Sequence, residues 1–158
     1  MTEYSVVPTT VEHVHQLVAT MRTADQAEIW ASAHYTPLEG LLASIRLTDE
    51  TFTGLADGRV LCIYGVGKVT LLSPVGHPWM LSSFLVESHV KAWARGSKAA
   101  FAGMIWNSNV MYLRNYVDAR YTEAVRWLKW LGFTIHPAEP FGIEQLPFHP
   151  FTWGTPNV

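Results

Sequence analysis

The stretch AVRWLKWLGF (residues 124–133) decides the fold. Its aliphatic residues recur at helical spacing and form one face of a helix expected over 121–131: Ala124, Val125, Leu128 and Leu131. Gly132 stands where a left-handed C-terminal cap belongs, and Phe133 starts a strand expected to reach His136. A helix that passes through a glycine directly into a strand is typical of α/β domains.

The order of the other expected elements extends this interpretation to the whole chain. Strands are expected over 4–8, 51–56, 59–66, 79–86 and 110–117, a loop over 74–78, and an edge strand in the Pro-broken tail 141–153. Helices are expected over 11–21, 24–32, 37–46 and 88–106. Asp57-Gly58 predicts an antiparallel hairpin, whereas the C-terminal strand–helix–strand order requires parallel neighbours. We therefore predict a single α/β domain over 1–158, a mixed β-sheet flanked by helices.

Two helix starts carry the signature of a capping box, a Ser or Thr followed three residues later by Glu or Gln. Thr9 with Glu12 is expected to cap the first helix, and Thr36 with Glu39 the third. Pro37 strengthens the second of these signals because its fixed φ suits the first helical position.

Composition excludes several functional classes. Of the 158 residues, 49% are hydrophobic and 15% charged, which excludes a disordered chain and a coiled coil. A net charge of −2 argues against binding nucleic acid through phosphate contacts. Cys62, the single cysteine, lies in an apolar run, and we find neither a membrane-spanning stretch nor a signal peptide. We therefore expect a cytoplasmic protein that binds neither membranes nor nucleic acid.

Neither a metal-binding motif nor a phosphate-binding loop is found in the sequence. None of the seven histidines is spaced as a metal-binding pair, so we expect no metal site. Gly65-Val66-Gly67-Lys68 lacks the loop length, the Ser or Thr and the following helix of a phosphate-binding loop.

Three segments, in this element order, resemble the GNAT (GCN5-related N-acetyltransferase) superfamily. Residues 57–60 (DGRV) look like its second and third strands, and 84–86 (FLV) look like the fourth strand that leads into the coenzyme A helix. The run 124–133 is similar to the penultimate helix, which commonly ends in Leu-Gly-Phe. The resemblance covers nearly the whole chain and implies a GNAT-like sheet, acetyl-CoA or coenzyme A as cofactor, and transfer of acetyl to an unidentified amine.

A narrower resemblance is to the small GNAT-like proteins of short-tailed bacteriophages, some of which are internal virion proteins. It rests on Asn115-Tyr116-Val117, on 125–132 (VRWLKWLG) and on the aromatic end 147–153 (PFHPFTW). It implies a location in the host cytoplasm or in the virion.

The GNAT resemblance implies a pyrophosphate site at the start of the long helix, where free N–H groups and the helix dipole favour an anion. Lys91 takes the place of the family's Gln or Arg, Gly96 matches the last glycine, and Ala94 replaces the first. The residues implied to contact the coenzyme are Leu85, Val86, Lys91, Ala94, Arg95, Gly96, Ser97 and Lys98. An ordinary solvated helix face is the alternative.

The resemblance also implies a base, and a tyrosine that protonates the leaving thiolate. Glu87 is the candidate base, with Glu50 as the alternative. Leu128 stands where the family often has its tyrosine, so the proton donor is expected to be Tyr121 or Tyr116.

Trp127 and Trp130 share a helix face that is offset from the apolar one. This face is either a protein-binding patch or is packed under the aromatic tail 148–153.

These features leave three functional hypotheses. The first is an active N-acetyltransferase. The second is a catalytically eroded GNAT-fold protein that binds a host or phage protein, during host takeover or virion assembly. The third is an unrelated α/β domain. The aromatic tail could also exchange between subunits of a homodimer.

Overall fold

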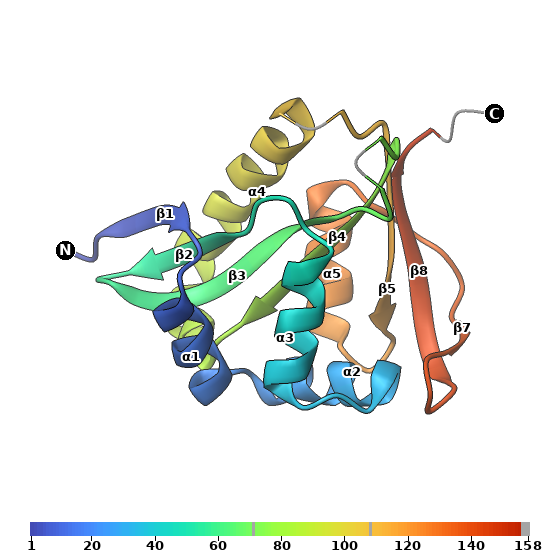
Figure 1. The fold of residues 1–158 in the computed structure, drawn as a ribbon, viewed down its shortest axis with the longest axis horizontal. Helices are drawn as coiled ribbons and strands as arrows, with labels where there is room; N and C mark the ends of the chain where they lie inside the picture. Colours follow the sequence, from blue (N-terminus) through green and yellow to red (C-terminus); the bar gives the residue numbers. More distant parts are fainter. Residues whose placement is uncertain (71, 108, 156–158) are drawn as a thin grey trace.

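The computed structural model describes residues 1–70, 72–107 and 109–155. Within these residues, the chain folds into an eight-stranded mixed sheet with helices on both faces (Figure 1). The strands are β1 (Tyr4–Pro8), β2 (Phe52–Ala56), β3 (Arg59–Gly67), β4 (Val75–Ser82), β5 (Tyr112–Asp118), β6 (Thr134–Ile135), β7 (Glu139–Phe141) and β8 (Leu146–Gly154). The helices are α1 (Val11–Thr20), α2 (Thr23–Ala33), α3 (Pro37–Arg46), the 3₁₀ helix η1 (Phe84–Ser88), α4 (Val90–Asn107) and α5 (Thr122–Leu131).

The sheet order is β1-β2-β3-β4-β5-β8-β6, with β7 paired to β8. Strands β1 to β4 are antiparallel neighbours, and β4 and β5 are parallel. Helices α1, α2 and α3 cover one face and α4 and α5 the other (Figure 1). The predicted mixed α/β sheet is therefore confirmed. In the described part of the chain, no helix is both long and apolar enough to cross a bilayer.

Each face of the sheet has its own apolar core. Leu17, Leu41 and Ile63 are fully buried between β3 and the first helices. Leu113 and Phe151 belong to a second cluster, which also holds the apolar face of α5. Of the four residues that the helical spacing of 124–131 predicted to face inward, Leu128 and Leu131 are buried, and Ala124 and Val125 are partly buried against the same cluster.

The predicted turns and caps are confirmed at three of four positions. Asp57 and Gly58 both have positive φ, as a two-residue hairpin requires. The side chains of Thr36 and Glu39 form a capping box, and Gly132 ends α5 at φ 103°. At α1 the prediction was one residue early, because Thr10 is the cap and its partner is the imidazole of His13.

The fourth strand lies earlier than predicted. The expected loop 74–78 is mostly strand, since β4 begins at Val75, and the expected strand residues 84–86 form the 3₁₀ helix. Ser83 ends the strand because both its N–H and its Oγ bond carbonyls of β3, at 2.8 and 2.7 Å. Val86 is buried against Leu61 and Trp93, so this short apolar run fills a core without being a strand.

The tail is also not the edge strand that its prolines suggested. β8 lies between β5 and β6. Pro147 and Pro150 are tolerated there because their carbonyls accept bonds from the N–H groups of Ala119 and His136. A proline removes a donor from a sheet, but not an acceptor.

Gly132 and Gly103 offer a matched test of the cap. An added Cβ would meet no atom within 4 Å at either site, but only Gly132 has a positive φ. We expect Gly132→Ala to lower the free energy of unfolding by about 1 kcal/mol, and Gly103→Ala, inside α4, to raise it by up to about 1 kcal/mol. Urea denaturation measures both changes, and equal destabilisation by the two substitutions would contradict the role of the cap.

Candidate functional site

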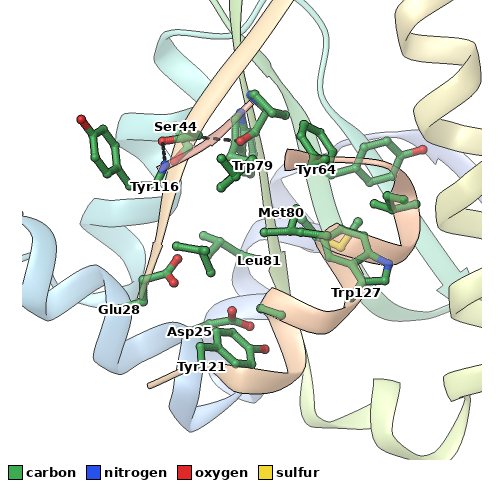
Figure 2. A pocket seen from close by; sticks show the side chains of 18 of the residues that line it. Asp25, Glu28, Ser44, Tyr64, Trp79, Met80, Leu81, Tyr116, Tyr121 and Trp127 are labelled. Atoms are coloured by element: carbon green, nitrogen blue, oxygen red, sulfur yellow. Dashed lines mark hydrogen bonds between the residues drawn. The ribbon is translucent and has the colours of Figure 1, made fainter. Parts of the chain in front are cut away.

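Strands β4 and β5 start as a pair and then separate. Their parallel register joins Val75 to Tyr112 and Gly76 to Leu113. Two residues later along both strands, the side-chain amide of Asn115 donates to the carbonyl of Pro78 at 2.9 Å, so a side chain takes the place of the neighbouring strand. A cavity of about 310 Å³ opens beyond this point (Figure 2).

The cavity passes through the sheet and reaches both helix layers. Helix α2 contributes Asp25 and Glu28 on one side, and α4 and α5 contribute Ala100 and Trp127 on the other. Most of the remaining wall is aromatic or aliphatic, including Tyr64, Trp79, Leu81, Tyr116, Phe148 and Phe151. An apolar cavity with a few polar groups is the usual form of a small-molecule site.

In β4, the backbone N–H and C=O groups of every second residue point into this gap. The carbonyl of Pro78 bonds Asn115, and the N–H of Ser82 donates to the carboxylate of Asp25 at 3.0 Å, so both groups point away from β3. Met80 lies midway between them and shares their orientation by strand alternation. Its N–H and C=O are therefore directed into the space that β5 has left.

Asp25 is buried at the end of β4. It is 4% exposed, and one oxygen, Oδ2, accepts from both the N–H and the hydroxyl of Ser82. Burial raises the pKa of this carboxyl to about 6, although the bonds from Ser82 act in the opposite direction.

Glu28 lies one helical turn after Asp25 and faces the same cavity (Figure 2). Its Oε2 accepts from the N–H of Asp118 at 2.9 Å. Burial raises the pKa of Glu28 to about 8, and the nearby charges of Asp25 and Asp118 add to the increase.

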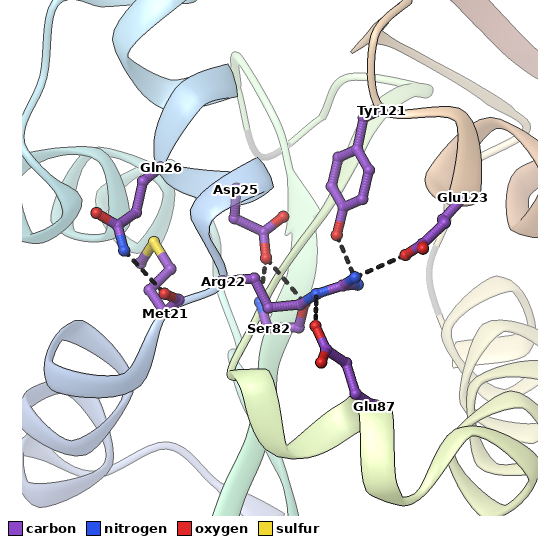
Figure 3. Close-up of polar contacts among 8 residues, drawn as sticks. All are labelled: Met21, Arg22, Asp25, Gln26, Ser82, Glu87, Tyr121 and Glu123. Carbon is purple, nitrogen blue, oxygen red and sulfur yellow. Dashed lines mark hydrogen bonds and ion pairs between the residues drawn. The ribbon is translucent and has the colours of Figure 1, made fainter.

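Tyr121 precedes α5 and closes the cavity next to Asp25. Its hydroxyl accepts from Nη1 of Arg22 at 2.9 Å (Figure 3). Burial raises the pKa of the phenol, so Tyr121 keeps its proton at neutral pH. Arg22 also bonds Glu123 at 2.6 Å and lies 3.7 Å from Glu87 (Figure 3). These contacts connect the end of β4 to the start of α5.

The predicted catalytic residues have separate places. Tyr121 and Tyr116 both line the cavity, and the ring of Tyr116 stacks on Phe141 at 4.0 Å. Glu87 lies on η1 with an exposed carboxylate beside Arg22, outside the cavity wall. Glu50 lines a different hollow, between β2, β3 and α4.

The predicted coenzyme residues lie on η1 and α4. The helix already includes Lys91, and the N–H of Trp93 bonds the carbonyl of His89, so Ala94 and Gly96 lie inside the helix and not before it. Ser97 is buried, where it bonds Ala94 and Trp127. Leu85 and Val86 pack against Trp93 on the sheet side of η1.

The basic residues of α4 are directed to solvent. Lys91, Arg95 and Lys98 are exposed, and Nζ of Lys98 lies 4.6 Å from the ring of Trp130. They follow one another at intervals of four and three residues, so they share one helix face.

Trp127 and Trp130 lie in different surroundings. Trp127 contacts α4, where its ring lies 4.9 Å from that of Trp93 and its Nε1 donates to Ser97 at 3.0 Å. Trp130 is 47% exposed. Neither predicted arrangement therefore holds for both rings, because Trp127 packs with the cluster that includes Phe151, whereas Trp130 is exposed.

Sequence reasoning missed Asp25 and Glu28. The available signal was their spacing, since acids three residues apart on a helix share a face with the apolar Ile29. Among the described residues, no group of three or more His, Cys, Asp or Glu is arranged to hold a metal ion.

Comparison with solved structures assigns the fold. Spermidine N-acetyltransferase from Vibrio cholerae, solved with CoA and spermine, matches with a TM-score of 0.70 and 13% identity over 95% of this chain and 94% of that one. Ard1 from Thermoplasma volcanium matches with a TM-score of 0.72 and 15% identity, over 98% and 99%. The yncA acetyltransferase from Salmonella typhimurium, solved with acetyl-CoA, matches with a TM-score of 0.71 and 12% identity, over 99% and 96%. The chain has the GNAT acetyltransferase fold.

These matches concern the fold alone, because all three identities are low. No protein-family model and no curated protein matches the sequence. Within the GNAT fold of this chain, the cavity described above lies where the parallel strands β4 and β5 separate.

The two raised carboxyl pKa values predict how stability depends on pH. In the folded chain the pKa is about 6 for Asp25 and about 8 for Glu28, against 3.8 and 4.5 as ordinary values. The folded state therefore binds these protons more tightly than the unfolded chain, and loses stability as pH rises between the two sets of values.

We expect the midpoint temperature of thermal unfolding to decrease as the pH rises from about 5 to about 8. We expect Glu28→Gln to remove most of this decrease. Glu12→Gln is the control, because Glu12 is exposed on α1 and its pKa is lowered, not raised. Scanning calorimetry at several pH values measures the effect. An unchanged slope in Glu28→Gln would contradict the raised pKa of this acid.

Proposed function

We propose that this protein is an acetyltransferase that binds acetyl-CoA between β4 and β5 and transfers the acetyl group to an amine. The observation that carries the proposal is the cavity at the point where these two strands separate. Similar folds were solved with CoA or acetyl-CoA bound, which supports this choice of cofactor.

The open backbone of β4 fits the acyl-bearing arm of the coenzyme. That arm contains two amides, and an extended chain with amides can pair with a free strand edge. Met80 directs one donor and one acceptor into the gap, between groups that Asn115 and Asp25 already occupy. The N–H of Met80 is therefore the donor available to an acyl carbonyl in the cavity.

The phosphates of the coenzyme would lie at the start of α4. Lys91, with Arg95 and Lys98 on the same face, supplies positive charge, and the first turn supplies the helix dipole. Ala94, Gly96 and Ser97 contribute as helix residues behind that face, and Leu85 and Val86 fix η1 before it. This assignment places the anion one turn before the glycine of the sequence motif.

Bound acetyl-CoA supplies an activated acyl group as a thioester. Tyr121 acts as the proton donor, because its phenol is held at the cavity by Arg22 and keeps its proton at neutral pH. Tyr116 forms part of the wall for the acceptor. Glu87 acts through Arg22, which it helps to hold against Tyr121.

A second function is favoured by the contact between α4 and α5. The ring of Trp93 lies 4.9 Å from that of Trp127, and Ser97 bonds the same indole, so the two helices are joined beside the cavity. Trp130, exposed on the same helix as Trp127, would suit a protein-binding surface. This alternative is a catalytically eroded GNAT-fold protein that binds a host or phage protein, as its resemblance to virion proteins implies.

Calorimetry separates the two functions. We expect CoA and acetyl-CoA to bind with micromolar Kd, and Ala100→Trp to weaken binding at least about 10-fold, because Ala100 lines the cavity. The matched control is Ala99→Trp, since Ala99 is exposed on the same helix and should leave the Kd unchanged. Absence of heat at millimolar ligand from a folded sample would contradict the acetyltransferase and favour the protein-binding alternative.

The phosphate assignment has its own test. We expect Lys91→Glu to weaken the binding of CoA at least about 10-fold at low salt. The loss should be smaller at high salt, because salt screens exposed charges. Pantetheine lacks the phosphates and should bind wild type and variant equally. Lys129→Glu, on the exposed side of α5, is the control for net charge. An equal loss for CoA and pantetheine would place the phosphates elsewhere.

A further inference from the structure

Glu28 is the less buried of the two acids that line the cavity, and one of its oxygens is left for a ligand. Its Oε2 accepts from the N–H of Asp118 at 2.9 Å. Within the described part of the chain, its Oε1 has no hydrogen-bond partner, and Figure 2 shows the carboxylate directed into the cavity. Asp25 differs, because the bonds from Ser82 hold it against the end of β4.

The surroundings of Glu28 suit an alkyl chain that ends in a cation. Ile29, Leu81 and Phe148 line the same cavity and offer apolar surface. A carboxylate with a free oxygen in such a place gains most from a charged donor, because the low dielectric strengthens the pair.

We propose that Glu28 binds the ammonium group of a primary alkylamine acceptor and accepts its proton, an inference that rests on the proposed acetyltransferase function. The ammonium gives one proton to the carboxylate, and the lone pair that this frees attacks the thioester carbonyl carbon. The C–S bond then breaks, and its electron pair leaves on sulfur. Tyr121 gives its proton to the thiolate and regains one from the nitrogen. Glu28 returns its proton to solvent.

The product no longer matches the site. Acetylation converts the ammonium into a neutral amide, which has no charge to pair with Glu28. The same carboxylate therefore favours the entry of the acceptor and the release of the product.

Four groups face Glu28 and set its titration. Asp25 lies on the same helix, Asp118 and Arg120 lie at the end of β5, and Tyr121 precedes α5. The guanidinium of Arg120 donates to both carboxylate oxygens of Asp118 with bonds of 2.7 to 3.2 Å, so its charge is paired with that acid. Burial and the two acids together raise the pKa of Glu28 to about 8, near which a general base is most effective.

The kinetic test uses the intact protein, saturating acetyl-CoA and varied concentrations of 1-aminobutane. We expect kcat/KM of the wild type for the amine, which reports the protein before the amine binds, to rise with pH through a midpoint near 8. We expect Glu28→Gln to lose this rise with pH and at least about 100-fold in kcat. Asp25→Asn should move the midpoint to lower pH, because removing a neighbouring negative charge lowers the pKa of Glu28.

Two further variants separate chemistry from structure. Tyr121→Phe should lower kcat but retain the rise of kcat/KM with pH, because the phenol is not the group that titrates. Glu12→Gln should behave as wild type in rate and in profile. A Glu28→Gln enzyme that keeps both its rate and its rise with pH would overturn the inference while leaving the acetyltransferase function in place.

A second measurement needs no turnover. ¹³C NMR of the glutamate side-chain carboxyls, with Glu28→Gln to assign the signal, should show Glu28 titrating near pH 8 in the free protein. Saturation with CoA and 1-aminobutane should lower that midpoint, because the cation favours the carboxylate. Titration in the ordinary range of a glutamate would overturn the inference. Absence of CoA binding in calorimetry would overturn the proposed function, and this inference with it.

Discussion

Two strands that begin as neighbours and then part leave backbone groups that need other partners. In this protein the constraint falls on β4, whose groups face a gap from Pro78 onward. Asn115 satisfies the carbonyl at the narrow end, and Asp25 satisfies the N–H of Ser82 at the wide end. Met80, between them, directs its backbone groups into the gap, where we propose that the ligand binds. The position of α2 follows from the same constraint, because that helix has to bring an acid to the end of β4.

Placing an acid there has an electrostatic consequence. Asp25 is desolvated where it accepts the hydrogen bonds from Ser82, and Glu28 lines the same cavity. Two carboxyls with raised pKa values therefore lie one helical turn apart. Arg22 lies at the edge and connects Tyr121, Glu123 and Glu87. Stability and the proposed chemistry are therefore opposed at this site, since the desolvation that would suit Glu28 to act as a base also makes its ionisation destabilising.

The sequence predicted elements whose signals are local and missed features that depend on contacts far along the chain. The Asp57-Gly58 hairpin, the Thr36 cap and the Gly132 cap are local, and all three are confirmed. The end of β4 depends on bonds from Ser83 to β3, and the central place of β8 depends on partners that precede it. In the sequence, Asp25 and Glu28 look like ordinary helix residues, because only the packing of α2 against the gap brings them to the cavity.

The two ends of the proposed coenzyme site depend on different parts of the chain. The acyl end uses backbone groups of β4, which any side chain at position 80 leaves in place. The phosphate end uses exposed charges on α4, where screening by solvent makes each contact weak. A substitution such as Ala94 in the helix motif therefore affects only the weaker and more replaceable end. Trp127 lines the cavity and lies 4.9 Å from the ring of Trp93, so the contact between α4 and α5 forms part of the wall at the proposed acyl end.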